Sequence, residues 1–306
     1  MKKWFVLLGL CLAVWSSFAQ AGELERIQNK GVITVSLNRE YPPFAMQKDG
    51  KPFGLDVDLA HLLAEYLGVK VRFIQPQSYD QQIPKLLAGE SDIIMAAMTR
   101  TIERGLKVNF TDPYFEVSQA ALVKRNLVSD GADSYFDLLE IDSISLGVKA
   151  GTTHEKFARE LFAANAIRLY PTADAAADAL IKDEVDAMVA DSPFIRVWRA
   201  THPEHYQKIV VLLQPVTKEY YAFAIRRGDQ AFLNWLNLFV GEIKTDGTLD
   251  LLKYEYFEQM RWAREKTTPQ KTLTRAQFLK NRFVARKKAM IEKRRKEFLG
   301  GGDLYE

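Results

Sequence analysis

Apolar residues along the first hundred positions follow the spacing of alternating strands and helices. Residues 32–37 are rich in β-branched side chains and alternate in polarity, which is typical of a strand. Residues 54–67 carry leucines at helical spacing, and a glycine follows them. The same reasoning predicts a strand at 69–74, a helix at 80–88 and a strand at 92–96. This order predicts a parallel sheet with right-handed crossovers.

A second pattern of the same kind starts near residue 145. Strands are predicted at 145–148, 167–170 and 187–190, and helices at 153–164 and 172–182. A chain of 306 residues is long for one compact core and suits two. The repeated pattern therefore predicts an α/β protein with a second lobe.

The first 21 residues have the features of a secretory signal peptide. Lys2 and Lys3 precede an apolar run at 4–14, and Ala19-Gln20-Ala21 offers small residues for cleavage after Ala21. The alternative is an uncleaved membrane anchor. It is disfavoured because the run is shorter than the roughly 20 apolar residues of a membrane span. We therefore expect export of the mature chain.

Cys11, the only cysteine, lies inside this segment. A mature chain that begins at residue 22 would contain no thiol, which excludes a cysteine nucleophile and a thiolate-ligated metal. The four histidines lack the spacing of a zinc site. We therefore expect neither a cofactor nor a metal.

Charge divides the chain into two parts. Residues 22–260 hold 26 Lys or Arg against 34 Asp or Glu, whereas residues 261–306 hold 14 against 5. We expect 263–306 to be a basic C-terminal extension with one long helix at 273–298 and a narrow apolar stripe. Such a helix could dock on an anionic membrane or in a partner's groove, or it could be a solvated extension. Nucleic-acid binding is not expected of an exported chain.

A group of hydroxyl and guanidinium side chains follows the strand predicted at 92–96. Thr99, Thr101 and Arg104 lie just past its carboxyl end, which is where open α/β sheets bind ligands. A guanidinium binds a carboxylate through two parallel hydrogen bonds, and a threonine hydroxyl can complete the set. This group is a candidate anion site.

The same segment resembles the signature of a known family. Residues 96–115, AAMTRTIERGLKVNFTDPYF, are similar to the signature of family-3 periplasmic solute-binding proteins, the amino-acid receptors of ABC importers. Tyr41-Pro42-Pro43-Phe44, the stretch 54–59 and the segment 220–257 agree with this resemblance. It covers residues 23–262, with the motifs in the family's order.

This resemblance implies the type II periplasmic-binding-protein fold. Each of its two lobes would be a mostly parallel sheet flanked by helices. Lobe 1 would comprise residues 22–116 and 219–262, and lobe 2 would comprise 117–218. The chain would cross between the lobes twice, near 114–118 and 217–221. Two such connections make a hinge that closes around a ligand.

The resemblance also implies roles for single residues. Arg104 would bind the carboxylate of an amino acid, helped by Thr99 and by the backbone near Thr153. Asp191, from the opposite lobe, would bind the ammonium group. The carbonyl of Ala97 would be a further acceptor, since this residue stands in place of a glycine common in the family.

Each of these roles has a structural alternative. Arg104 follows a glutamate on a turn and could form a surface salt bridge. Thr99 could be a turn or N-cap residue. Asp191 precedes Ser-Pro and could cap the next helix.

Other positions bear on the side chain of the ligand. Tyr41 and Phe44 could stack on it or pack in the core. Asn38 stands where receptors for basic amino acids tend to carry an aspartate. Lys149 and Arg100 add positive charge near the cleft, unless they point to solvent. Together these residues argue against lysine or arginine as the ligand and favour a polar or acidic side chain.

Two positions depart from the family's pattern. Arg100 is a cation where the family usually has an apolar or small residue, and Ala97 replaces a glycine. Either could mark a ligand other than a standard α-amino acid.

Three functions are consistent with this sequence. The one that we expect is a monomeric, non-enzymatic receptor that captures an amino acid or a related organic acid and delivers it to an ABC-transporter permease in the inner membrane. The second is an exported enzyme of the same fold, similar to cyclohexadienyl dehydratases, with Glu116 or Glu219 as the acid. The third is a ligand-sensing protein that acts through the basic C-terminal helix.

Overall fold

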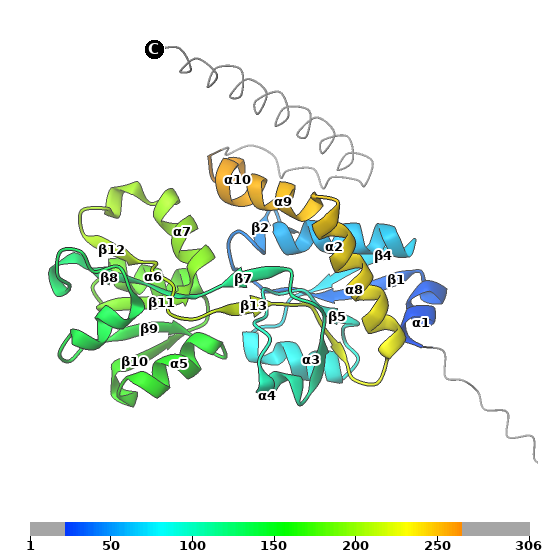
Figure 1. The fold of residues 1–306 in the computed structure, drawn as a ribbon, viewed down its shortest axis with the longest axis horizontal. Coiled ribbons are helices and arrows are strands. Elements are labelled where there is room, and N and C mark those ends of the chain that lie inside the picture. Colours follow the sequence, from blue (N-terminus) through cyan, green and yellow to red (C-terminus); the bar gives the residue numbers. More distant parts are fainter. Residues whose placement is uncertain (1–21, 265–306) are drawn as a thin grey trace, which may run out of the picture.

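The computed structural model describes residues 22–264 (Figure 1). The predicted signal peptide and the predicted basic extension after residue 264 lie outside the described residues. Two five-stranded sheets form the centres of two lobes, which lie next to each other along the long axis of the molecule.

Lobe 1 is built on a sheet with the strand order β4-β1-β5-β14-β6. β1 is parallel to β4 and β5, and β14 is antiparallel to β5 and β6, so four of the five strands run in one direction. The strands are β1 (Val32–Ser36), β4 (Lys70–Ile74), β5 (Ile93–Ile94), β6 (Val108–Phe110) and β14 (Ala224–Arg226). The hairpin of this lobe consists of β2 (Met46–Lys48) and β3 (Lys51–Phe53).

Helices cover the sheet of lobe 1 because the parallel strands are joined by crossovers. They are α1 (Glu23–Lys30), α2 (Leu55–Leu67), α3 (Gln82–Leu87), α4 (Ile102–Gly105), α8 (Gln230–Thr245), α9 (Thr248–Lys253) and α10 (Arg261–Arg264). A 3₁₀ turn, Tyr79–Gln81, precedes α3, and a π-helical segment, Tyr254–Gln259, follows α9. Figure 1 shows α2 and α3 on opposite sides of the sheet.

Lobe 2 repeats this arrangement, with the strand order β10-β9-β11-β8-β12. β8 runs against its two neighbours, and the other strands share one direction. The strands are β8 (Gln119–Lys124), β9 (Leu146–Lys149), β10 (Ile167–Tyr170), β11 (Ala187–Asp191) and β12 (Ile209–Leu212). The helices are α5 (Thr153–Leu161), α6 (Ala173–Ile181) and α7 (Ser192–Thr201). The predicted mostly parallel sheets are confirmed.

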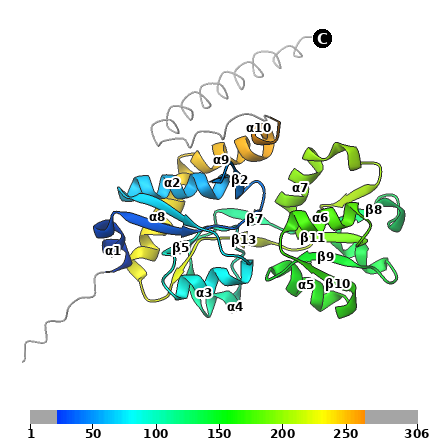
Figure 2. The same cartoon turned by 180° about the vertical axis from the view of Figure 1, so that it is seen from behind.

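Two short strands join the lobes. β7 (Phe115–Val117) and β13 (Glu219–Tyr221) pair antiparallel, with Tyr220 opposite Glu116. They run between the two sheets in the views of Figures 1 and 2. The chain passes from lobe 1 to lobe 2 through β7 and returns through β13. The predicted two-lobed α/β fold with two crossings is confirmed.

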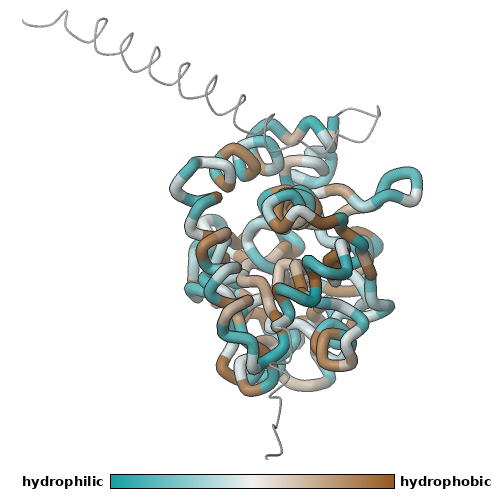
Figure 3. The backbone as a smooth tube through the Cα atoms, turned by 90° about the vertical axis from the view of Figure 1, so that its right-hand side faces the viewer, coloured by the Kyte–Doolittle hydropathy of each residue, from teal (hydrophilic) through white to brown (hydrophobic). Residues whose placement is uncertain are grey.

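The apolar core extends from one lobe to the other. Tyr41 of lobe 1 stacks on Phe194 of lobe 2, with 5.5 Å between the ring centres, and both belong to one cluster of buried side chains. Hydrophobic and hydrophilic residues alternate along the tube in Figure 3, as expected for elements that are buried on one side. The structure therefore shows the lobes in contact.

The strand predicted at 92–96 is shorter in the structure, where β5 covers only Ile93–Ile94. The chain leaves the sheet because Ala97 adopts a left-handed backbone, with φ of 48°. Its N–H group donates a hydrogen bond to the Asp56 carboxylate (2.8 Å) instead of to a neighbouring strand. The residues after β5 thereby form a loop that faces lobe 2.

Candidate ligand-binding site

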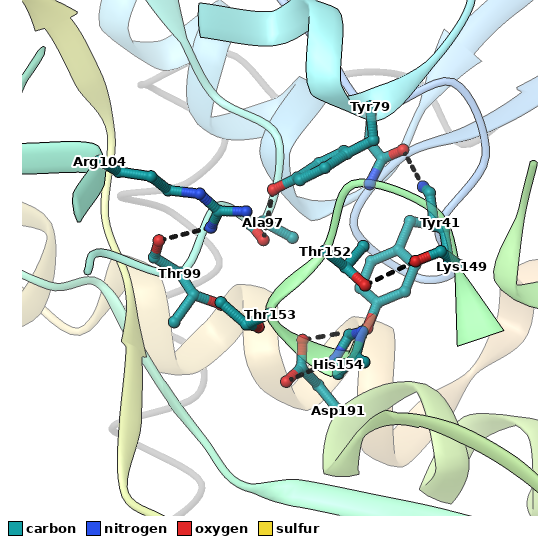
Figure 4. Close-up of a pocket in the computed structure, with 11 residues that line it drawn as sticks. Tyr41, Tyr79, Ala97, Thr99, Arg104, Lys149, Thr152, Thr153, His154 and Asp191 are labelled. Atoms are coloured by element: carbon teal, nitrogen blue, oxygen red, sulfur yellow. Dashed lines mark hydrogen bonds and ion pairs between the residues drawn. The ribbon is translucent and has the colours of Figure 1, made fainter. Parts of the chain in front are cut away.

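A small pocket lies between the lobes and is lined by residues of both (Figure 4). Its cavity volume is about 10 Å³, so the side chains nearly fill it in this arrangement of the lobes. Its lining includes eight residues that the sequence marked as ligand-binding candidates, together with three others. The eleven are Asn38, Tyr41, Tyr79, Ala97, Thr99, Arg104, Lys149, Thr152, Thr153, His154 and Asp191.

Arg104 extends from α4 across the mouth of lobe 1. Its Nη1 donates to the Thr99 carbonyl (2.7 Å), and its Nη2 donates to the Gly151 carbonyl of lobe 2 (3.4 Å). The neighbouring Glu103 pairs with Lys156 instead. The alternative of a surface salt bridge for Arg104 is therefore wrong, and the guanidinium is held at the pocket by backbone oxygens.

Thr99 does not cap α4. The cap is Thr101, whose hydroxyl accepts a hydrogen bond from the backbone N–H of Arg104 (3.2 Å). Thr99 instead forms a β-bridge with Tyr221, the last residue of β13, and it is almost fully buried. The bridge fixes its side chain at the edge of the pocket.

Asp191 ends β11 and is 2% exposed. It occupies the N-cap position of α7, yet its side chain makes no capping hydrogen bond. Oδ2 accepts hydrogen bonds from the hydroxyls of Tyr41 (3.2 Å) and Tyr221. The alternative of a capping role is therefore wrong, and the carboxylate points into the pocket (Figure 4).

Two tyrosines orient this carboxylate as hydrogen-bond donors. Burial raises the pKa of Tyr41 and Tyr221 well above the ordinary value, and the negative charge of Asp191 raises both further. Both phenols therefore keep their protons and donate to Asp191. Phe44 packs against the Tyr41 and Tyr221 rings in the core and does not line the pocket.

The amino end of α5 forms the wall of lobe 2. Thr152 is its N-cap: the hydroxyl accepts from the backbone N–H of Glu155 (3.4 Å) and donates to the Lys149 carbonyl (2.7 Å). Thr153 and His154 begin the helix. The first N–H groups of a helix have no partner within it, and the helix dipole is positive there. This end of α5 therefore favours a carboxylate.

His154 is the most notable side chain that the sequence reasoning did not select. It is 4% exposed, and its Nε2 lies 2.9 Å from Asp191 Oδ1. The two atoms are at ion-pair distance, but their alignment is not that of a hydrogen bond, so Oδ1 and both ring nitrogens lack a hydrogen-bond partner in the described chain. Buried polar atoms are costly unless they are paired. A ligand that supplies donors and acceptors here would relieve that cost.

Lys149 ends β9 and is 4% exposed, so it does not point to solvent. Its Nζ donates to Asn38 Oδ1 (2.7 Å) across the two lobes. The ammonium also lies 5.4 Å from the centre of the Tyr41 ring and 5.0 Å from that of Tyr79. Burial lowers the pKa of Lys149 to about 8, although the charges of Asp174 and Glu40 oppose this change.

Tyr79 lines the pocket, and its ring lies between two cations. Arg104 lies 5.7 Å from the centre of its ring, and Lys149 lies 5.0 Å from it. Its hydroxyl donates to the carbonyl of Ala97 (3.4 Å), the oxygen that was expected to face the ligand. Burial raises the pKa of Tyr79 to about 12, so the phenol stays protonated.

Three other residues that the sequence analysis considered do not line the pocket. Arg100 is exposed and lies over the Tyr220 ring at 5.6 Å, so it does not enter the pocket. Glu116 is exposed and pairs with Lys218 (3.2 Å). Glu219 accepts hydrogen bonds from Gln119 (2.7 Å) and Thr217 (3.0 Å). Neither glutamate lines the pocket, so neither is placed to act as an acid there.

Among residues 22–264, no group of three or more potential ligands is placed to hold a metal ion. In the same part of the chain, no helix combines the length and the apolar character that crossing a membrane requires.

The loop that carries Tyr41 is fixed to the start of α2. The backbone N–H groups of Leu55 and Asp56 donate to the carbonyls of Pro43 and Phe44, both at 3.0 Å. Gly54 has φ of 137°, and a Cβ atom there would lie 2.4 Å from the Phe44 oxygen. Only glycine therefore permits this contact.

Replacing Ala97 with glycine should raise the free energy of unfolding by up to about 1 kcal/mol. The reason is that the strain of an L-residue in a left-handed backbone conformation exceeds the extra conformational entropy that glycine loses on folding. Ala97 has φ of 48° in the pocket loop. Chemical denaturation of wild type and Ala97→Gly measures the difference. A clear loss of stability would show that the alanine methyl group contributes more by packing than its backbone conformation costs.

Asp56 makes the free energy of unfolding depend on pH. Burial raises the pKa of this carboxyl from 3.8 to about 7, against the opposing hydrogen bonds from Tyr114 and Ala97. The folded protein thus keeps a proton that the unfolded chain releases near 3.8. The resulting stability is fully present below that value and is lost as the pH rises through about 7.

Relative to Asp56→Asn, which has no such proton, the wild type should lose stability on the order of 3 kcal/mol between pH 4 and pH 7. Urea denaturation of both proteins at several pH values measures this. Parallel stability curves would mean that Asp56 is already ionised in the folded state at low pH.

Comparison with known proteins agrees with this architecture. The sequence profile of bacterial extracellular solute-binding proteins, family 3, matches residues 33–259. The chain is 28% identical over 243 residues to the L-cystine-binding protein TcyJ of Escherichia coli K12. This alignment covers 79% of the chain and 88% of TcyJ. It is also 28% identical over 262 residues to the cyclohexadienyl dehydratase of Pseudomonas aeruginosa, spanning 82% of this chain and 93% of the enzyme.

A solved structure shares the fold. It is that of the ancestral amino acid-binding protein AncCDT-1, a precursor of cyclohexadienyl dehydratase. The TM-score is 0.68 and the identity 37%, over 78% of this chain and all of the other. The profile match covers well over half of the sequence. The chain therefore belongs to family 3 of the bacterial extracellular solute-binding proteins.

Proposed function

We propose that this protein is an exported, monomeric receptor that captures an amino acid between its lobes and delivers it to an ABC importer. The observation that carries the proposal is the arrangement of opposite charges in one buried pocket. Arg104 of lobe 1 and Asp191 of lobe 2 both line it. A free amino acid presents a carboxylate and an ammonium on one carbon, and this pair is complementary to both.

The carboxylate would bind at Arg104 and the start of α5. The guanidinium is positioned by two backbone carbonyls and forms no ion pair with a described carboxylate. Thr99 and the backbone N–H groups at Thr153 would supply further donors. These contacts reach both lobes, because Arg104 and Thr99 belong to lobe 1 and Thr153 to lobe 2.

The ammonium group would bind at Asp191. This carboxylate is buried, Tyr41 and Tyr221 fix its Oδ2, and its Oδ1 has no hydrogen-bond partner in the described part of the chain. An ammonium donor at Oδ1 would pair a buried charge that is otherwise costly. His154 would then lie beside the bound group.

Capture would work by closure of the lobes. A ligand that contacts both lobes stabilises the closed arrangement over an open one. The two strands β7 and β13, which join the lobes, are the proposed hinge. In the closed form, Tyr41, Lys149 and Arg104 all make contacts across the lobes.

A thermal-shift screen of the purified protein against the standard amino acids tests this function. Any co-purified ligand is first removed by unfolding and refolding. A ligand at about 100 times its dissociation constant should add roughly 2.7 kcal/mol of stability. A shift with at least one amino acid is expected. No shift with any of them would contradict an amino-acid receptor.

A second function is supported by the similarity to a cyclohexadienyl dehydratase. Such an enzyme needs an acid inside the cleft, and the buried His154 and Asp191 are the candidates that the structure places there. Incubation with prephenate or arogenate, followed by assay of the released product, distinguishes the two functions. Turnover would establish the enzyme, and stabilisation without turnover would remove it.

A further inference from the structure

We infer that the ligand is an amino acid with an acidic side chain, whose second carboxylate binds Lys149. This inference rests on the proposed function and extends it to the ligand's side chain. Its basis is the balance of charge around the pocket and the position of Lys149 within it.

The pocket contains two cations that lack a carboxylate partner. Arg104 and Lys149 both line it, and neither forms an ion pair with a described carboxylate. Asp191 is the one carboxylate among the lining residues. A zwitterion with a neutral side chain would pair Arg104 and Asp191 and leave Lys149 buried without a counter-ion. An acidic amino acid brings two carboxylates and one ammonium, which matches all three groups.

Lys149 is built into the site. It is 4% exposed, and in the described part of the chain its ammonium makes one hydrogen bond, to Asn38 Oδ1 at 2.7 Å. The ammonium has three donors, so donors remain for a ligand. Asp174 and Glu40 act on it only from beyond ion-pair distance. A buried charge without a partner is strongly destabilising, and an ion pair with additional hydrogen bonds offsets its lost hydration.

The topology places Lys149 and Asp191 at the same edge of the lobe 2 sheet. Lys149 ends β9 and Asp191 ends β11, and these are neighbouring parallel strands in which Val148 lies opposite Val189. Their carboxyl ends therefore meet at one edge of the sheet. The Tyr79 ring contacts the cations of both Lys149 and Arg104. The two residues that would bind the ligand's carboxylates therefore lie on either side of one aromatic ring (Figure 4).

There is room for a side chain next to Lys149. A second cavity, of about 180 Å³, shares Asn38, Tyr79 and Lys149 with the pocket. Lys149 thus stands at the junction of the two spaces. Asn38 is a neutral acceptor at this junction, and the charged residues that line the second cavity are Arg39, Glu40 and Lys149. Two cations against one carboxylate give this lining a net positive charge, which favours an acidic side chain over a cationic one.

Calorimetric titration of the refolded protein with glutamate, aspartate, their amides, arginine and histidine tests the inference without any variant. The acidic amino acids should bind at least about 30-fold more tightly than their amides, as expected for pairing a buried charge. Tighter binding of an amide, arginine or histidine would overturn the inference and leave the proposed function intact. Binding of no amino acid would overturn both.

Two substitutions of Lys149 then test its role. Lys149→Met and Lys149→Gln should reduce the affinity for the preferred acidic amino acid at least about 30-fold while changing that for its amide little. Having two variants guards against misfolding of one. Lys182→Met, which removes an exposed lysine of the same lobe, is the matched control and should bind as wild type. If both Lys149 variants still bind the acidic amino acid more tightly than its amide, Lys149 does not bind the second carboxylate. Its role would then be limited to the hydrogen bond with Asn38.

Discussion

Replacing Arg104 with alanine should lower the affinity for the amino-acid ligand by roughly 2–5 kcal/mol, or about 30- to 5,000-fold, because the ligand carboxylate would be left buried without its partner. The guanidinium is positioned before any ligand arrives, by the carbonyls of Thr99 (2.7 Å) and Gly151 (3.4 Å). It therefore needs little reorganisation on binding. Arg104→Lys keeps the charge but loses the paired donors. Its affinity for the ligand should therefore lie between that of the wild type and that of Arg104→Ala.

Calorimetric titration of both variants measures this effect, with denaturation in the absence of ligand to separate binding from stability. Arg100→Ala is a matched control. It removes an arginine only four positions away, but that side chain is exposed over the Tyr220 ring. This variant should bind as wild type. If Arg104→Ala binds as tightly as Arg100→Ala, the carboxylate does not lie at Arg104.

The second large effect is expected from Asp191→Asn. The amide has nearly the same shape and can still accept hydrogen bonds from the tyrosines, but it carries no charge for the ammonium group. Amino-acid affinity should fall by about 2 kcal/mol or more, because the ammonium would lose its only charged partner in the described pocket.

A ligand that lacks the ammonium gives the control for Asp191. The deaminated analogue of the preferred amino acid should bind the wild type more weakly than the amino acid does, and Asp191→Asn should change its affinity little. The selectivity for the amino group should therefore disappear in the variant. Equal losses for the amino acid and its analogue would mean that Asp191 shapes the pocket instead of binding the ammonium.

The repeated α/β pattern was enough to predict the fold, but not all of its strands. β8 has no predicted counterpart, although it is the antiparallel strand of lobe 2 and lies between β11 and β12. Its sequence includes the continuous apolar run 120–123 and is buried at nearly every position. Such a run does not alternate, so periodicity alone cannot separate it from a short helix. Its pairing with β11 and β12 depends on contacts between residues distant in the sequence.

The polar residues of the pocket were easier to predict because they lie at the ends of elements. Thr99, Lys149, Thr153 and Asp191 all follow or end a strand or begin a helix, and the family's motifs cover that region. The alternatives for Thr99 and Asp191, as caps, fail for a reason that only coordinates show. Thr101 takes the capping position of α4, and the tyrosines take Asp191 Oδ2.

Tyr79 and His154 could not be selected in the same way. Tyr79 begins a short 3₁₀ turn and belongs to one buried apolar cluster with Leu86 of α3, a contact that no local pattern encodes. His154 directly follows the predicted Thr153, and its position in the first turn of α5 was an available signal. Considering histidines only as metal ligands overlooks a histidine that lies beside a buried carboxylate, as His154 does at Asp191.

A crystal structure of the protein with the amino acid that stabilises it most tests the central claim most directly. We predict the α-carboxylate within hydrogen-bond distance of the Arg104 guanidinium and the ammonium at Asp191 Oδ1, with the ligand enclosed by both lobes. A ligand bound outside this pocket, or one with its ammonium directed toward Arg104, would contradict the account.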